Sequence, residues 1–270
     1  MARENAKSNR ELFKGAAQYY ARFRKGYPKG FFEYVIKYFQ LDGKGRLLDL
    51  GCGTGQIAIP LAPYFEEVVG LDIDKDMLEE AGKQAVSKGI KNIKWILGNA
   101  EDASKGLGIF RLAVFGASFH WVEQKRTLAK LYEILDKDGG LVIVGGSSSI
   151  WRNPEKEPWK ERCKEVVQKY LGEKRRAGNS YYVEPKGKFE DIVAASKFGN
   201  PEKWTYNHER KKNIDDIIGL LYTTSFAQRR FFGGRVGDFE RELRNELLKI
   251  NPRGEFTEKV KTEALLAHKF

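Results

Sequence analysis

The stretch LLDLGCGTGQ, residues 47–56, decides the fold, because a short apolar run stops at a cluster of glycines and a helical pattern begins at once. Gly51, Gly53 and Gly55 have no Cβ, so the backbone here can approach a ligand closely. The first N–H groups of the following helix point at the same spot. This pattern predicts a nucleotide-like cofactor held at the carboxyl edge of a parallel sheet.

The spacing of the glycines indicates which kind of nucleotide is bound. A dinucleotide site reads G-x-G-x-x-G, which would place its last glycine at position 56, but that residue is Gln56 and the third glycine comes one residue earlier. The next apolar run, residues 68–71, ends in Asp72, which follows Gly51 by 21 residues. An acidic side chain at about this interval binds ribose hydroxyls. The sequence therefore keeps the ribose-binding feature of a dinucleotide site and alters the pyrophosphate-binding one.

Strand and helix patterns alternate as far as residue 146, which predicts an α/β fold with a doubly wound, mostly parallel sheet and right-handed crossovers. The expected strands are 46–50, 67–72, 92–97, 111–115 and 141–144, and the expected helices are 29–40, one from the glycine loop to near Pro63, 74–88 and 123–136. Beyond residue 146 the pattern of strands and helices is less regular. Residues 155–198 read as irregular helix, 202–208 as strand, 214–223 and 237–250 as helix, and 256–268 fit either type.

Five motifs in order resemble those of the class I S-adenosylmethionine-dependent methyltransferases. They are Asp49 two residues before G-x-G-x-G, Asp72 ending the second strand, GLDIDKDML at 70–78, GNAED at 98–102 and DKDGG at 136–140. Asn99 departs from the commoner Asp, and Asp138 replaces a turn proline. The resemblance implies a Rossmann-like fold whose sheet ends in antiparallel strands, here 202–208 and 256–268, the last of them beside the fifth strand. It also implies a helical cap inserted late in the chain.

The same resemblance implies S-adenosylmethionine as cofactor, S-adenosylhomocysteine as product, and a set of residues that bind them. Asn99 can still hydrogen-bond the adenine amino group, and the family places a methionine such as Met77 beside adenine. The implied cofactor-binding residues are Asp49, Gly51, Gly53, Thr54, Gly55, Gln56, Asp72, Ile73, Met77, Asn99, Ala100, Glu101 and Ser118.

The N-terminal segment is similar to that of a small-molecule subgroup that resembles trans-aconitate methyltransferase. Phe13, Tyr20 and residues 24–28 match its pattern, with Lys25 in place of a proline, and Thr223-Thr224-Ser225 matches a late motif in part. The resemblance implies that Tyr20 and Arg24 close over the cofactor, where Arg24 would pair with the methionine carboxylate. The alternative is a basic, solvated arm.

The residues after the fourth strand, Ala117-Ser118-Phe119-His120-Trp121, indicate where methyl acceptor and cofactor meet. His120 is either a base that takes a proton from a hydroxyl or carboxyl acceptor, or a packing residue beside the cofactor. The predicted substrate-binding residues are Tyr20, His120, Trp121 and Trp151. The stretch is not the Asx-Pro-Pro-aromatic motif typical of base-amino methylation, and it lacks the cysteine nucleophile of pyrimidine C5 methylation.

Composition limits the class of protein. The chain has 270 residues and 41% apolar residues, which suits one large domain or one domain with a substantial insertion. The chain has only two cysteines, so we expect no disulfide framework, and we expect no metal site. It has no apolar leader and no long apolar run, so we expect a cytoplasmic protein without a membrane span. The net charge of +11 is spread among interleaved acids. Residues 22–25 and 174–176 are locally basic but lack the regular aromatic spacing of a base-stacking surface.

We therefore expect three parts: a lid at 1–40, a cofactor-binding core at 41–146, and a cap at 147–270 interleaved with the last two core strands. The expected function is methyl transfer to an oxygen of a small-molecule acceptor. Nucleic acid is a less favoured partner, and no membrane is expected. Two alternatives stay open: an RNA or protein methyltransferase that uses the positive charge, and a cofactor-binding regulator without turnover.

Overall fold

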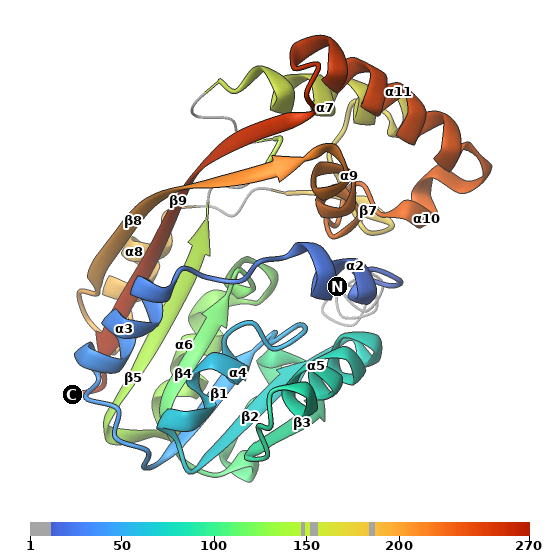
Figure 1. Ribbon diagram of the computed structural model, residues 1–270. Helices are drawn as coiled ribbons and strands as arrows, with labels where there is room; N and C mark the ends of the chain where they lie inside the picture. Colours follow the sequence, from blue (N-terminus) through green and yellow to red (C-terminus); the bar gives the residue numbers. More distant parts are fainter. Residues whose placement is uncertain (1–11, 147–148, 152–155, 184–186) are drawn as a thin grey trace. The chain divides into compact units, whose positions relative to one another are not determined.

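The computed structural model describes residues 12–146, 149–151, 156–183 and 187–270 (Figure 1). The chain forms two compact units. Unit 1 comprises residues up to 25, 146–183 and 207–261, and unit 2 comprises 26–145, 184–206 and 262–270. The predicted lid at 1–40 is thus divided between the units at residue 25, and its residues 1–11 lie outside the described part of the chain.

A seven-stranded sheet, with strand order β3-β2-β1-β4-β5-β9-β8, is the main element of unit 2. The five strands from β3 to β5 are parallel neighbours, whereas β9 runs against β5 and β8 (Figure 1). The predicted Rossmann-like sheet, including the last strand beside the fifth, is confirmed. The strands are β1 Arg46–Leu50, β2 Glu67–Asp72, β3 Ile93–Leu97, β4 Phe110–Gly116, β5 Leu135–Gly146, β8 Glu202–Asn213 and β9 Glu255–His268.

Both faces of this sheet are covered by apolar clusters, which explains why its inner strands read as continuous apolar runs. Successive residues of β1 enter different clusters: Leu48 packs in one with α6, and Leu47 packs in the other with α3 and α4. The helices of this unit are α3 Lys29–Tyr38, α4 Ala58–Leu61, α5 Lys75–Ser87, α6 Gln124–Ile134 and α8 Phe189–Ala194, with short 3-10 turns η1 Ala62–Tyr64, η2 Ala100–Asp102, η3 Lys105–Leu107 and η4 Phe119–Trp121.

Strand β5 begins earlier than predicted. Leu135 already pairs with Phe110, and the register between β4 and β5 then shifts before Leu112 pairs with Gly140. The backbone N–H of Lys269 also donates to the Gly139 carbonyl. Residues 136–140, which we expected to form a turn, are therefore part of the sheet because they pair with neighbours on both sides. The sequence of the stretch itself does not indicate these neighbours.

Unit 1 has a separate apolar core built from four longer elements, α2 Ala17–Phe23, α7 Pro158–Leu171, α9 Ile214–Tyr222 and α11 Val236–Ile250. Phe232 stacks on Phe239 at the centre, with ring centroids 3.9 Å apart. Helix α2 packs closely on α9 at Gly219, where the Phe23 ring occupies the space that a Cβ atom would need. The unit also contains α10 Arg229–Phe232 and the turn η5 Gly233–Arg235.

The stretch 155–198 was expected to be irregular helix, and part of it is instead a small hairpin. Strands β6 Arg176–Ala177 and β7 Ser180–Tyr181 pair antiparallel. Gly178 in the turn has φ +60°, a conformation that glycine adopts without strain. The predicted helices 214–223 and 237–250 are confirmed as α9 and α11. Among the described residues, none of the helices is both long and apolar enough to cross a membrane.

Candidate functional site

The predicted cofactor site lies in unit 2, where four loops leave the carboxyl ends of β1, β2, β3 and β4. Strands β1 and β4 are neighbours in the sheet although they are far apart in the chain. The chain order reverses between these two strands, which is where ligands bind in open α/β sheets. The sheet therefore brings together the loops that carry Gly51, Asp72, Asn99 and His120.

The loop after β1 is held by the end of β2. The N–H groups of Gly51 and Cys52 donate to the Leu71 carbonyl at 2.8 and 3.1 Å. Gly51 and Gly55 have φ of +69° and +83°, a region that favours glycine. A Cβ on Gly51 would come within 2.7 Å of Ser118 Cβ, and one on Gly55 within 2.8 Å of Ile59. Glycine is therefore required at these two positions because side chains of the protein itself lie against them. From the sequence we had expected glycine there so that a ligand could approach the backbone closely.

Asp49, at the end of β1, is a buried carboxylate that is only half satisfied. Its Oδ2 accepts a hydrogen bond from the Ala58 N–H at 3.0 Å, at the start of α4. Its Oδ1 has no hydrogen-bond partner among the described residues, and the side chain is 1% exposed. Burial, with a smaller contribution from the charge of Asp72, raises the pKa of Asp49 to about 7. Such an atom needs an ordered water or a cationic ligand group.

Asp72, at the end of β2, joins the glycine loop to the start of α5. Its Oδ2 accepts from the Gly53 N–H at 2.8 Å, and its Oδ1 accepts from the Asp74 N–H at 2.9 Å. Burial raises the pKa of Asp72, and the two backbone donors oppose that shift. Asp74 caps α5 by accepting from the N–H groups of Asp76 and Met77. Each Asp72 oxygen keeps a second lone pair, so the carboxylate can still accept from ribose hydroxyls.

Several other predicted cofactor residues have structural partners of their own. Gln56 Nε2 donates to Thr54 Oγ1 at 2.7 Å within the glycine loop. Asn99 Oδ1 accepts from the Glu101 N–H at 3.0 Å, and Glu101 Oε1 accepts from the Glu123 N–H at 2.7 Å, where α6 begins. Met77 is buried, while Ile73 and Ala100 are half-buried. Their roles toward a cofactor stay predictions.

The loop after β4 contains a strained residue that the sequence did not reveal. Ala117 has φ +55°, and its N–H donates to the Val144 carbonyl at 2.8 Å. An alanine in this conformation costs about 1–2 kcal/mol, and such strain collects at functional sites. Ser118 Oγ then donates to the Leu50 carbonyl at 2.6 Å, which fastens this loop to the end of β1. No pattern marks an alanine for a left-handed conformation, so Ala117 could not have been found.

His120 and Trp121 follow in the η4 turn, on the loop that starts with Ala117. Their ring centroids are 4.4 Å apart, and both side chains are half-buried. Strand β4 and the strained turn after it therefore present an imidazole and an indole together at the carboxyl edge of the sheet. This is the pair that the sequence predicts as acceptor-binding residues.

The remaining predicted residues, Tyr20, Arg24 and Trp151, belong to unit 1. Arg24 Nε donates to Thr223 Oγ1 at 2.9 Å, and its guanidinium carbon lies 5.1 Å from the centre of the Tyr20 ring. Trp151 packs edge-on against Phe226, with ring centroids 5.9 Å apart. Tyr20, Arg24 and Thr223 thus meet within one unit, whereas residues 26–28 of the same N-terminal motif belong to unit 2. Their contact with cofactor or acceptor stays a prediction.

The geometry of unit 2 fits a ligand with a ribose and a cationic group. Asp72 is placed for the hydroxyls, and the buried, half-satisfied Asp49 favours positive charge nearby. The residues that the structure describes contain no group of three or more His, Cys, Asp or Glu side chains that could hold a metal ion.

Comparison with known proteins identifies the same region. A family described as "Methyltransferase domain" matches residues 47–139, which lie within unit 2. The uncharacterized methyltransferase YcgJ of Bacillus subtilis is 29% identical over 41% of this chain and 44% of its own length. Trans-aconitate 2-methyltransferase of Deinococcus radiodurans is 35% identical over 37% of this chain and 36% of its own. The chain thus spans less than half the length of these two relatives.

Longer matches are weaker in identity. The uncharacterized methyltransferase-like protein C25B8.10 of Schizosaccharomyces pombe is 23% identical over 93% of this chain and 91% of its own length. The crystal structure of YcgJ superposes with a TM-score of 0.53, covering 88% of this chain and 97% of that one at 18% identity. This likeness shows a shared fold.

Proposed function

Because this chain belongs to the class I S-adenosylmethionine-dependent methyltransferases, with S-adenosylmethionine as cofactor, we propose that it methylates an oxygen atom of a small-molecule acceptor. The proposal about the acceptor rests on the His120–Trp121 pair, which follows β4 directly. The same loop is held to β1 by the hydrogen bond from Ser118 to the Leu50 carbonyl. The partial likeness to a trans-aconitate 2-methyltransferase supports a small acceptor. We further propose a cytoplasmic location, which the two free, buried cysteines support.

The cofactor supplies an electrophilic methyl group on a sulfonium with a neutral thioether as leaving group. Asp72 would hold the ribose hydroxyls, and Asp49 would contribute negative charge toward the cationic part. The remaining task of the protein is to place the acceptor oxygen in line and to exclude water, for which the Trp121 indole offers an apolar wall.

His120 would act on the acceptor. A hydroxyl acceptor must lose its proton as its oxygen forms the new bond to carbon, and a neutral imidazole can take that proton. A carboxylate acceptor is already deprotonated, so His120 would then only orient it. The two acceptor types therefore predict different consequences of removing the imidazole. The lid and cap roles expected for residues 1–40 and 147–270 are part of this proposal.

The experiment is an incubation of the protein with radiolabelled S-adenosylmethionine and three separate acceptor pools: small organic acids and alcohols, transfer RNA, and protein. We expect label in a small molecule, identified by its mass, and no effect of nuclease. Label that appears only in RNA or protein would overturn the small-acceptor proposal. Cofactor binding without turnover on any pool would favour the non-catalytic regulator.

His120→Ala separates the two roles of that residue. We expect it to lower kcat on a hydroxyl acceptor by about 100-fold or more while cofactor affinity, measured by calorimetry, stays unchanged. The matched control is His208→Ala, whose ring on β8 accepts from Arg210 Nε at 3.1 Å. Equal losses of turnover and cofactor affinity in His120→Ala would make it a binding residue only.

A further inference from the structure

Strand β8 is a long, exposed edge of the seven-stranded sheet. It is the last strand in the order, and within the part of the chain that the structure describes its one strand neighbour is β9 (Figure 1). It is a continuous strand of 12 residues, and every side chain from 202 to 210 is exposed or half-buried. Such an edge presents backbone N–H and C=O groups with which a second strand can pair. A long edge is therefore either protected against pairing or used for it.

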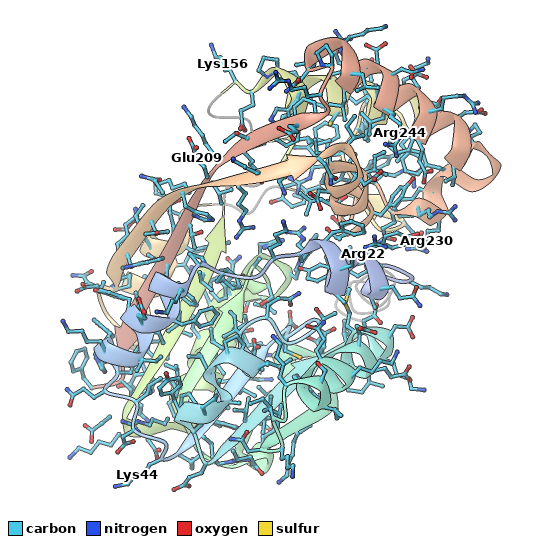
Figure 2. All side chains as sticks on the ribbon, in the orientation of Figure 1. Arg22, Lys44, Lys156, Glu209, Arg230 and Arg244 are labelled. Carbon is cyan, nitrogen blue, oxygen red and sulfur yellow. The ribbon has the colours of Figure 1, made fainter. Side chains whose placement is uncertain are left out.

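The charges on β8 favour pairing with a second copy of the same strand. Opposite charges that face each other across two strands stabilise the pair, and like charges destabilise it. Read inward from its two ends, the stretch EKWTYNHER at 202–210 carries an acid and then a base from one side, and a base and then an acid from the other. An antiparallel pair centred on Tyr206 thus places Glu202 opposite the partner's Arg210, and Lys203 opposite the partner's Glu209. Glu209 is exposed and is labelled in Figure 2.

The neighbouring registers do not match the charges. Side chains alternate between the two faces of a strand, so a symmetric antiparallel pair must be centred on a residue and not between two. Centring the pair on Thr205 would place Lys203 opposite the partner's Asn207. Centring it on Asn207 would place Lys203 opposite the partner's Lys211. The charges therefore single out Tyr206 as the centre.

The charged side chains can make these contacts in addition to those within their own chain. Lys203 Nζ lies 3.1 Å from Glu190 Oε2, and both side chains are about half exposed. A surface ion pair of this kind contributes little, and an ammonium has three donors, so Lys203 can bind a second carboxylate. Glu202 Oε1 accepts from the Tyr34 hydroxyl, and a carboxylate has a second oxygen that a guanidinium can reach.

The middle of the strand adds aromatic surface to the charges at its ends. The rings of Trp204 and Tyr206 stack with their centroids 5.8 Å apart and 8° between their planes. Tyr206 is 43% exposed. In the register centred on Tyr206, this residue meets its own copy and Trp204 meets the partner's His208. Aromatic pairs across two strands stabilise a sheet, so they support the same register as the charges.

We propose that β8 pairs antiparallel with β8 of a second copy of this chain, centred on Tyr206, so that the two sheets become continuous. This contact is isologous, because each copy contributes the same surface. Self-pairing accounts for a strand whose charges are complementary to themselves, which a partner of unrelated sequence does not require. The contact does not use the methyl-transfer site, so it stands independently of the function proposed above.

Sedimentation equilibrium of the full chain over a range of protein concentrations tests the contact. We expect a monomer–dimer equilibrium. Lys203→Glu and Glu209→Lys should each weaken the dimer about 10-fold or more, because each turns two attractive pairs of the symmetric dimer into two repulsive ones. The double variant Lys203→Glu/Glu209→Lys restores both pairs with the charges exchanged and should regain most of the affinity. The matched control is Lys211→Glu, a charge reversal on the same strand that should not weaken the dimer.

A cysteine at the centre of the pair tests the register. Residue 206 would lie directly opposite its own copy, with Cα atoms about 4.5–5.5 Å apart, which a disulfide can bridge. Residue 205 would lie about 8 Å from its own copy, which is too far. Tyr206→Cys should therefore form a disulfide-linked dimer on mild oxidation, and Thr205→Cys should not. The two native cysteines, Cys52 and Cys163, are buried.

Four results would overturn the self-pairing of β8. They are a chain that stays monomeric at every concentration, single variants that dimerise as well as the unchanged chain, a double variant no stronger than the single ones, and equal weakening by Lys211→Glu. Open-ended assembly in place of a dimer would do the same, because a two-fold pair closes. Cross-linking of Thr205→Cys in preference to Tyr206→Cys would overturn the register.

Discussion

Replacing Asp49 with asparagine should make the stability of the protein less dependent on pH. Burial raises the pKa of Asp49 to about 7 in the folded protein, against about 3.9 in an unfolded chain. Between these values the folded state binds more protons than the unfolded state, so stability falls as pH rises. Above about pH 7 the Asp49 carboxylate is ionised in both states, and its cost levels off.

The magnitude follows from the two pKa values. From pH 5 to pH 8 the contribution of Asp49 to the free energy of unfolding should decrease by about 2–3 kcal/mol. The asparagine side chain does not titrate, so the difference in stability between Asp49→Asn and the unchanged protein should shift in favour of the variant by that amount. Comparing two pH values cancels the fixed cost of the new amide, whose nitrogen would replace the unpartnered Oδ1.

The assay is urea unfolding of cofactor-free protein at pH 5 and pH 8. Asp138→Asn, at an exposed position in β5, is the matched control for loss of one acidic charge and should show no such shift. Asp49→Asn should also bind S-adenosylmethionine more weakly than the unchanged protein at pH 8, where the lost carboxylate is ionised. A stability difference between Asp49→Asn and the unchanged protein that is the same at both pH values would refute the reasoning about this buried group.

Three further predictions concern the free energy of unfolding. Gly51→Ala should destabilise the fold by about 2 kcal/mol or more in denaturant titrations, from its positive φ and its clash with Ser118, and this cost should be smaller when Gly51→Ala is made in a Ser118→Gly background; an equal cost in both backgrounds would contradict the clash. Ala117→Gly should raise the free energy of unfolding by about 0.5–1 kcal/mol, and a decrease would show that Ala117 is unstrained. Lys160→Met should cost about 3 kcal/mol in urea unfolding at neutral pH, because Lys160 is 2% exposed and pairs with Glu157 and Glu258, while Lys212 stays as a counter-charge for Glu258 alone of these two carboxylates; a neutral effect would mean that this cluster is hydrated.

The sheet could be predicted, and so could the position of the candidate binding residues Asp49 and Asp72 at the ends of its strands, because each rests on local chemistry. Apolar runs that end at Gly51 and Asp72 mark parallel strands and a ribose site, and both runs form strands with the predicted bounds. The order of β9 beside β5 followed from the family resemblance, since residues 256–268 alone fit a strand or a helix.

Features that depend on distant contacts could not be predicted. Ala117 is left-handed because its N–H is held by β5, and Ser118 is turned toward β1 by the Leu50 carbonyl. The role of Gly51 likewise depends on Ser118, which follows a different strand. Arg176 and Arg230 come from basic runs that are far apart in the sequence, and only the folded chain brings both to the Phe231 ring.

The most direct test of the account is a crystal structure of the protein with S-adenosylhomocysteine. We expect the ribose hydroxyls to donate to the Asp72 carboxylate, the glycine loop at 51–55 to line the ligand, and His120 and Trp121 to face the sulfur. A ligand bound elsewhere, or the carboxyl edge of β1 and β4 closed by protein side chains, would contradict the assignment of this edge as the methyl-transfer site.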